Sequence, residues 1–455
     1  MMKKLWKAIA LAGLMSFGIA GCETEPDSNT EARTAGYAET DRARETKDGG
    51  VDNSKTSQTK NGSEKETKAP ETQAVKETEG GFTGEVGDFK FYNNELTSYK
   101  GSDATVVIPD GVTAIGPFAF IRKATVTTVV IPDSVTTIHS NAFQECTALT
   151  DINIPNSVTE IKGEAFTWCT SLKTIEIPDS VTEIGIDAFY GCDNLTSAKL
   201  PSKLASIPEG LFDGCKKLAD VAIPATVTKI GPGAFSGCGS LAEIEIPDTV
   251  TSIGVNAFAG TAWLYEKMKE DPFVVVNGLL IKADMTDDAV VPDGVTSISG
   301  AFIGCKYLSS VKIPNSVTAI ENGSFQNCER LTQVEIPDSV TRIGDNEPSD
   351  IAGGAFAGCV HLSNITIPNS VTSLGRGAFL GCSWLVNVEL PDSLTEIGER
   401  AFANCTALPS LEIPASVTEI GKNAFSECPK LTVTVTAGSY AEQYCKDNGV
   451  NYTTK

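Results

Sequence analysis

The stretch IPDSVTEIGIDAFYGCDNLTSAK, from Ile177 to Lys199, is a near-copy of IPNSVTEIKGEAFTWCTSLKTIE, from Ile154 to Glu176. Each stretch is 23 residues long, and an apolar residue followed by proline recurs at this period through most of the chain. The apolar members of these pairs are Ile108, Ile131, Ile154, Ile177, Leu200, Ile223, Ile246, Val291, Ile313, Ile336, Ile367, Leu390 and Ile413. A fixed period in the twenties is typical of a solenoid, in which each coil buries its apolar side chains against its neighbours.

A single repeat predicts the path of one coil. Apolar residues 149, 152 and 154 have the L-x-x-L-x-L spacing of a leucine-rich-repeat strand. Pro155 then ends the ladder because it has no N–H to donate, and residues 158–161 predict a second short extended piece. Ala165 and Phe166 predict a helical turn whose aromatic ring fills the core. The chain is therefore expected to form a right-handed β-solenoid or horseshoe of the leucine-rich-repeat type, with about 13 coils and a parallel sheet on its concave side.

The repeats fall into two predicted blocks, residues 84–262 (block 1) and 263–435 (block 2). Block 2 opens with residues that could form one or two helical turns and with Asn277-Gly278, which predicts a type I′ hairpin turn; block 1 opens with a similar layout. Residues 436–455 predict a C-terminal cap, a short helix with Ser439 as its N-cap. Whether the solenoid is continuous across residues 263–290 is left open, and an eight-residue insertion, 345–352, is expected to bulge on the side opposite the concave sheet.

Eleven of the 13 cysteines occupy one repeat position, where leucine-rich repeats place Asn or Cys. We interpret them as a structural cysteine ladder that lies inside the coils, since free cysteine is among the most buried residue types. A disulfide between neighbouring coils is less favoured, because parallel side chains in register seldom reach the required dihedral angle. No C-x-x-C pair exists, so no metal site is expected. The ladder consists of Cys146, Cys169, Cys192, Cys215, Cys238, Cys305, Cys328, Cys359, Cys382, Cys405 and Cys428.

The N-terminus predicts export. Residues 1–21 contain early lysines and a short apolar run, as a signal peptide does, and the run ends in Ile-Ala-Gly-Cys. This ending resembles the bacterial lipobox, which implies cleavage before Cys22 and lipidation of that residue; an ordinary signal peptide is the alternative. Residues 22–83 are rich in polar and charged residues and predict a disordered acidic or polar tether. The mature protein is expected to be held on a membrane by its lipid anchor, without crossing it.

Charge and composition limit the possible functions. The formal net charge is -22, which argues against nucleic acid as a partner because nucleic-acid binding requires basic patches. The two histidines, His139 and His361, have no nucleophile motif beside them, so we expect no enzyme activity and no cofactor. Carboxylates at outward positions of the predicted strands form a candidate concave binding face, although a merely solvated face is an alternative. Its residues are Asp151, Glu176, Asp220, Glu243, Glu245, Glu335, Glu389 and Glu412.

The repeated motif IPDSVTEIGIDAFYGC…L resembles the BspA-like bacterial leucine-rich repeats over about residues 86–450. This resemblance implies an exported or surface protein of bacteria that adheres to host proteins or to other cells. We therefore expect a lipid-anchored, adhesin-like protein of the cell envelope, exposed at the surface, that binds a protein partner through its concave face. The alternatives are a glycan-capturing lipoprotein, with Trp263 or Trp384 as a sugar platform, and a structural envelope spacer. The sequence leaves the ligand and the oligomeric state open.

Overall fold

The computed structural model describes residues 83–285, 287–346 and 353–455. The predicted signal peptide, the lipidation site Cys22 and almost all of the predicted tether lie outside the described residues, as does most of the insertion after Gly344.

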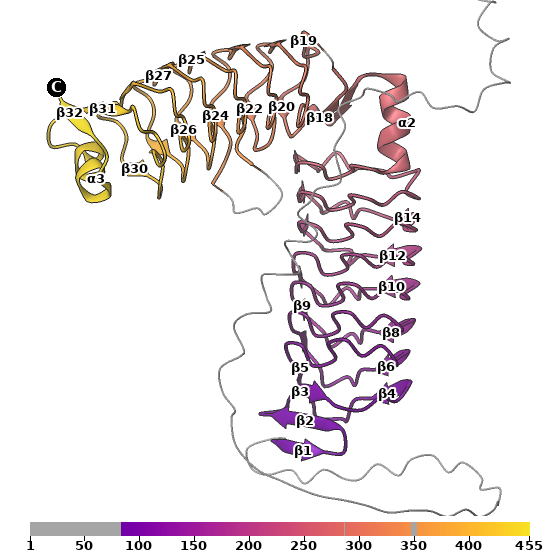
Figure 1. Ribbon diagram of the computed structural model, residues 1–455. Coiled ribbons are helices and arrows are strands. Elements are labelled where there is room, and N and C mark those ends of the chain that lie inside the picture. Colours follow the sequence, from indigo (N-terminus) through magenta and orange to yellow (C-terminus); the bar gives the residue numbers. More distant parts are fainter. Residues whose placement is uncertain (1–82, 286, 347–352) are drawn as a thin grey trace, which may run out of the picture. The chain divides into compact units, whose positions relative to one another are not determined.

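The described chain is a parallel β-solenoid, as the period predicts, and it has about 15 turns (Figure 1). Each regular turn gives a strand of mostly three residues to one side of the solenoid and a strand of two residues to another. The first set, which we call the long strands, comprises β4 (Thr105–Val107), β6 (Thr128–Val130), β8 (Asp151–Asn153), β10 (Thr174–Glu176), β12 (Ser197–Lys199), β14 (Asp220–Val221), β19 (Ala289–Val290), β21 (Ser310–Lys312), β23 (Gln333–Glu335), β25 (Asn364–Thr366), β27 (Asn387–Glu389), β29 (Ser410–Glu412) and β31 (Thr432–Val435). The short strands are β5 (Ala114–Ile115), β7 (Thr137–Ile138), β9 (Glu160–Ile161), β11 (Glu183–Ile184), β13 (Ser206–Ile207), β15 (Lys229–Ile230), β16 (Ser252–Ile253), β20 (Ser297–Ile298), β22 (Ala319–Ile320), β24 (Arg342–Ile343), β26 (Ser373–Leu374), β28 (Glu396–Ile397) and β30 (Glu419–Ile420).

Two hairpins explain why the structure has about 15 turns where the proline motifs predict 13. Strands β1 (Gly84–Val86), β2 (Phe89–Tyr92) and β3 (Glu95–Tyr99) open block 1, and β17 (Phe273–Val276) and β18 (Leu279–Ala283) open block 2. The last strand of each hairpin unit pairs in parallel with the next short strand, β3 with β5 and β18 with β20. Each hairpin therefore supplies an additional turn that carries no proline motif.

The helical turn expected near each core phenylalanine does not form. The chain there makes tight turns with left-handed residues, such as Glu164 (φ 57°) and Trp168 (φ 61°). Positive φ is incompatible with a right-handed helix, and the N–H groups donate to the neighbouring coil instead, as Phe166 does to the carbonyl of Ala188 at 2.8 Å. The phenylalanine rings still fill the core as a column: neighbouring rings from Phe120 to Phe258 stack with centroids 4.9–5.8 Å apart.

The ladder cysteines lie beside this column. All are free, and all except Cys428 are buried. In most coils the thiol donates to the carbonyl oxygen of the phenylalanine one coil earlier; the Sγ–O distance from Cys169 to Phe143 is 3.2 Å. Burial raises the pKa of several of these thiols, to about 12 for Cys146 and Cys382. The thiol is thus a second donor to this carbonyl, since the oxygen of Phe143 also accepts from the N–H of Cys146 at 3.1 Å.

The hydrogen-bonded sheets do not run unbroken through the molecule. The short-strand sheet stops between β11 and β13, where Pro208 occupies the position at which Gly185 and Gly231 each donate an N–H to the preceding coil at 2.8 Å. Because proline has no N–H, the ladder lacks this bond. A second stop separates β16 from the sheet that begins at β17.

The join between the blocks holds helix α2 (Ala262–Glu270), which follows the N-cap Thr261. Asn277, in the hairpin turn after it, has φ 50°, and Gly278 has φ 77°, as a type I′ turn requires. The Asn277 side-chain amide also donates to the carbonyls of Pro247 (2.8 Å) and Val250 (3.1 Å) in block 1. Side-chain hydrogen bonds therefore link the blocks at the point where the sheet ladder stops.

The C-terminal end of the solenoid is covered by helix α3 (Tyr440–Asn448). The Ser439 side chain accepts from the N–H of Glu442, and Gly449 follows in the left-handed conformation with φ 66°. The Tyr444 hydroxyl donates to the carbonyl of Gly421 at 3.0 Å, which fixes the helix on the last coil. A final strand that the sequence analysis did not predict, β32 (Tyr452–Thr454), pairs with β31 and extends the long-strand sheet.

Candidate binding face

The solvent side of the long strands, which we call the long-strand face, is built by simple alternation. The middle residue of a strand points inward, as Ile152 does in β8, while Asp151 and Asn153 on either side of it are exposed. Stacking the coils aligns these outward residues into two rows, since each pairs in register with its counterpart, as Thr174 pairs with Ser197. The result is a mostly polar surface with one pair of variable residues per coil.

The structure sorts the predicted face residues into two groups. Asp151, Glu176, Asp220, Glu335, Glu389 and Glu412 lie on long strands and are exposed. Glu243 and Glu245 are exposed too, but no strand forms between Leu241 and Ile246. No strand forms here because the next segment on that side is helix α2 at the join between the blocks, not another long strand. The N–H of Trp263 in this helix donates to the carbonyl of Leu241 at 2.8 Å. The expectation that these two glutamates lie on a strand is therefore wrong.

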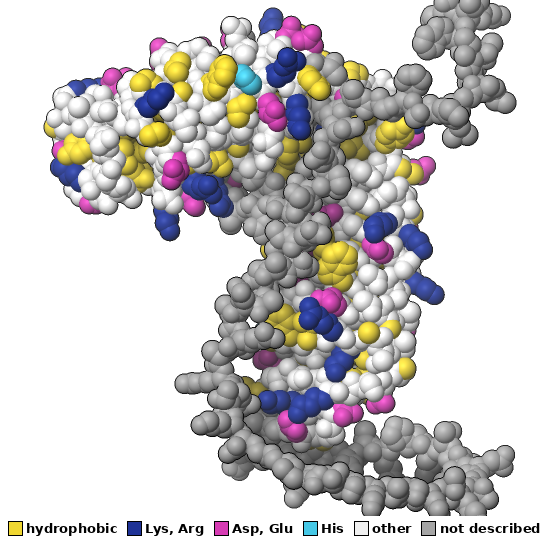
Figure 2. Space-filling model, in the orientation of Figure 1, with side chains coloured by type: hydrophobic (Ala, Val, Ile, Leu, Met, Phe, Trp, Pro, Cys, Tyr) yellow, Lys and Arg dark blue, Asp and Glu magenta, His cyan; other side chains and the backbone are white. Residues whose placement is uncertain are grey.

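Three of the carboxylates have partners within the chain. Lys199 donates to Glu176 from the next coil, and this hydrogen bond raises the lysine pKa. Lys455 donates to Glu412 from the far end of the sequence, and Ser197 donates to Asp220 at 3.1 Å. These pairs are exposed, so they contribute little to stability. Figure 2 shows basic and acidic side chains interspersed over the visible surface.

The other five carboxylates, Asp151, Glu243, Glu245, Glu335 and Glu389, accept no hydrogen bond and form no ion pair with any described residue. Glu389 and Glu412 lie at matching positions of neighbouring long strands, where like charges repel each other. One of these two glutamates has an internal cation, which the sequence reasoning missed because the lysine lies 43 residues away.

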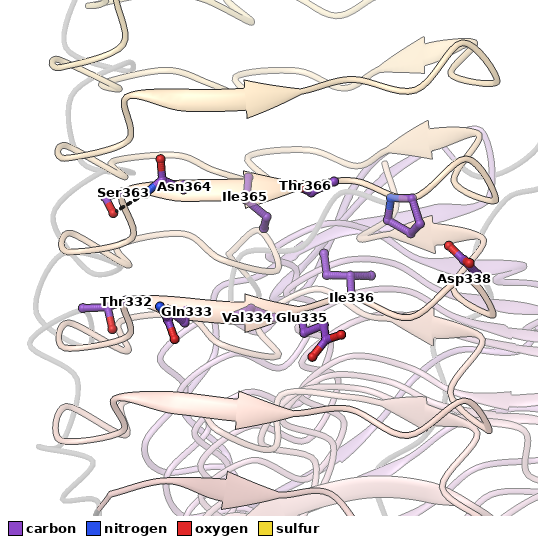
Figure 3. A pocket seen from close by; sticks show the side chains of 11 residues that line it. Thr332, Gln333, Val334, Glu335, Ile336, Asp338, Ser363, Asn364, Ile365 and Thr366 are labelled. Carbon is purple, nitrogen blue, oxygen red and sulfur yellow. Dashed lines mark hydrogen bonds between the residues drawn. The ribbon is translucent and has the colours of Figure 1, made fainter.

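A depression of about 550 Å³ lies on this face between β23 and β25 (Figure 3). Gln333 and Glu335 line one wall and Ser363 and Asn364 the other. These two strands are not hydrogen-bonded to each other, although the short strands β24 and β26 of the same coils pair in register. No feature of the repeat predicted this opening, since it depends on the distance between two coils and not on residue type.

The two tryptophans proposed as sugar platforms differ. Trp263 is 9% exposed and packs on Phe258, with ring centroids 4.9 Å apart. It is part of the core at the join and cannot serve as a platform. Trp384 is 59% exposed and makes an edge contact with His361, with ring centroids 4.5 Å apart.

Within the described ranges, no group of three or more His, Cys, Asp or Glu residues could hold a metal ion. The described chain also has no helix with the length and apolar character needed to span a membrane.

Comparison with known proteins identifies the repeat. The family model described as "BspA type Leucine rich repeat region (6 copies)" matches residues 84–218, 136–265, 284–347 and 349–445. A leucine-rich cell surface protein from Faecalibacterium prausnitzii is 32% identical, with 79% of this chain and 96% of that chain covered and a TM-score of 0.41. A leucine-rich repeat protein from Bacteroides ovatus is 26% identical, with 81% and 91% covered and a TM-score of 0.40. Among curated proteins none matches the sequence.

Proposed function

The chain belongs to the family of proteins with BspA-type leucine-rich repeats, and from this premise we propose that it is an adhesin-like envelope protein that binds a basic protein partner through its long-strand face. In this proposal Cys22 carries a lipid anchor, residues 23–83 act as a spacer, and the solenoid is presented at the bacterial surface. The named surface location of the F. prausnitzii relative supports the last point.

The observation that carries the proposal is the set of carboxylates without an internal cation. Glu335 and Glu389 are exposed on β23 and β27, two coils apart, and neither has a basic partner among the described residues. A basic protein surface would supply the missing charges, and complementary charge increases both the rate and the specificity of association. The backbone of the long strands is also held in place by the neighbouring coils, which lowers the entropic cost of binding.

Charge reversal on the two faces tests the proposal. The double variant Glu335→Lys/Glu389→Lys is compared with Glu183→Lys/Glu419→Lys, which makes the same change in net charge on exposed positions of the short strands. We expect partner capture from host extracellular matrix or from neighbouring cells to fall at least tenfold for the first variant and to be unchanged for the second. Equal capture by wild type and both variants would remove the long-strand face from the proposal. The absence of any partner for the wild type would favour the structural spacer.

The anchor is tested separately. We expect Cys22→Ser to move the protein from the membrane fraction to the soluble fraction, whereas Cys445→Ser should leave it in place. Mass spectrometry of the mature N-terminal peptide then shows directly whether Cys22 is the first residue and carries a lipid. An unmodified N-terminus at another residue would identify an ordinary signal peptide.

A further inference from the structure

A row of planar side chains runs along one corner of block 2. The residue immediately before the leucine that leads into each long strand is Tyr307, Arg330, His361 and Trp384 in four successive coils. Tyr307 and Trp384 are each 59% exposed. The matching positions in block 1 hold only small or flexible residues, namely Ala148, Ser171, Asn194, Lys217 and Ser240. The row is therefore a feature of block 2 and not of the repeat.

Contacts between coils order this row. The Arg330 guanidinium lies 5.9 Å from the centre of the Tyr307 ring. The His361 ring makes its edge contact with Trp384, and its Nδ1 lies 2.5 Å from the carbonyl oxygen of Glu329 in the preceding coil. Such contacts between rings and cations hold the side chains in place. The exposed faces of Tyr307 and Trp384 thus form the two ends of a pre-ordered strip.

The depression between β23 and β25 lies beside the middle of this row, because its lining begins two residues after Arg330 on one wall and two residues after His361 on the other. On one flank the N–H of Thr332 donates to Ser309 at 3.0 Å, and on the other the N–H of Val386 donates to Ser363 at 2.9 Å. Between the walls the corresponding bond, from the N–H of Ser363 to Thr332, is absent from the described structure. This opening leaves backbone donors and acceptors available inside the depression.

The side chains of the depression add further hydrogen-bonding groups. The side chains of Gln333, Glu335 and Asp338 have no hydrogen-bond partner among the described residues. The side-chain amide of Asn364 donates to the Ser363 hydroxyl at 2.8 Å. Figure 3 shows the labelled side chains of Gln333 and Glu335 along one strand and those of Ser363 and Asn364 along the next. The site therefore combines amides, hydroxyls and carboxylates with aromatic rings at its edge.

We propose that the planar row and the depression beside it form a binding site for a neutral, extended, β-linked oligosaccharide. The aromatic faces would stack on the apolar C–H face of pyranose rings, while the amides and carboxylates would bind the hydroxyl groups. Hydrogen-bonded coils repeat at about 4.8 Å, slightly less than the length of one sugar unit in such a chain, and the step between β23 and β25 is not hydrogen-bonded. The four-coil row therefore extends over a length of the same order as a short oligosaccharide. The charged residues that line the depression, Glu335 and Asp338, are both acidic and disfavour an anionic glycan.

Titration of the full chain in detergent with defined hexasaccharides tests this site. The probes are β-1,4-linked glucose, mannose and N-acetylglucosamine hexamers, with the α-linked maltohexaose and an anionic galacturonate hexamer as ligand controls. We expect at least one neutral β-linked hexamer to bind in calorimetry and to bind better than its own dimer. Both ligand controls should bind at least tenfold more weakly.

Matched variants locate the site. Trp384→Ala and Asn364→Ala should each lower the affinity at least tenfold. Trp168→Ala is the control, because Trp168 is a half-buried tryptophan of block 1 that packs edge-on against Tyr190 with centroids 5.2 Å apart, away from the row. Binding of none of the neutral hexamers, equal binding of maltohexaose, or unchanged affinity in both Trp384→Ala and Asn364→Ala would overturn the proposal. The titration contains no protein partner, so its outcome is independent of the outcome of the capture experiment.

Discussion

Replacing one ring of the phenylalanine column should loosen its own coils and leave distant coils unchanged. Phe189 is 0% exposed and stacks between Phe166 and Phe212, with centroids 5.1 and 5.8 Å away. Phe189→Ala removes a buried ring and leaves a cavity, which costs about 4 kcal/mol. Because each coil contacts only its neighbours, this cost is borne by a few coils.

Hydrogen exchange with mass spectrometry measures the effect coil by coil. About 4 kcal/mol corresponds to about three decades in the opening equilibrium, so amides that bridge these coils, such as Phe166 N–H to Ala188, should exchange up to a thousandfold faster. Peptides from residues 353–435 should be unaffected. Phe118→Ala is the matched control, since that ring is 49% exposed, and it should change exchange less than threefold. An acceleration below tenfold next to the cavity, or an equal acceleration in both blocks, would refute the nearest-neighbour reasoning.

Two other predictions follow from contacts in the core and at the join. A bulky maleimide should label Cys428 first in the native protein, since the other ladder thiols are buried, and rapid labelling of most thiols would contradict the packing. Burial raises the thiol pKa from about 9 to about 12 for Cys146 and Cys382, so the unfolded chain loses these protons before the folded chain does. Stability should therefore fall as the pH rises from 9 to 12, seen as a lower guanidinium midpoint at pH 10 than at pH 8; an unchanged midpoint would argue against buried thiols. Asn277→Ala should cost about 1–3 kcal/mol in urea unfolding, because it loses two hydrogen bonds to block 1 carbonyls as well as the turn preference. Asn93→Ala changes the same turn position in the first hairpin, where the Asn93 side chain makes no such bonds to any residue from 83 onward that the structure describes. An equal loss in both variants would show that only the turn matters.

The sequence predicted those features that are determined by residues close together in the chain. The period of 23 predicted the solenoid, since an apolar residue followed by proline recurs at the end of every long strand except β31. Asn277-Gly278 and Ser439 predicted a turn and a helix start, because both depend on the conformation of a few adjacent residues. The helical turn at Phe166 was wrong for a related reason. Residue preferences suggested a helix, but hydrogen bonds to the next coil were available and favoured left-handed turns.

Features that depend on distances between coils came only from the structure. Three examples are the opening between β23 and β25, the pairing of Lys455 with Glu412 and the burial of Trp263. Each depends on residues that are far apart in the sequence and that no local pattern connects. The loss of a strand around Glu243 likewise follows from the helix that replaces its neighbour.

The sequence by itself therefore determined the repeating coil, its buried phenylalanines and leucines and the alternation that places a polar residue on the surface, because each repeat carries this information. The tertiary structure decided which of those polar residues remain without a partner and where neighbouring coils separate. These properties arise from contacts between coils. The geometry of those contacts depends on departures from the repeat, at the join and at single residues such as Pro208, which cannot donate the N–H that the ladder requires.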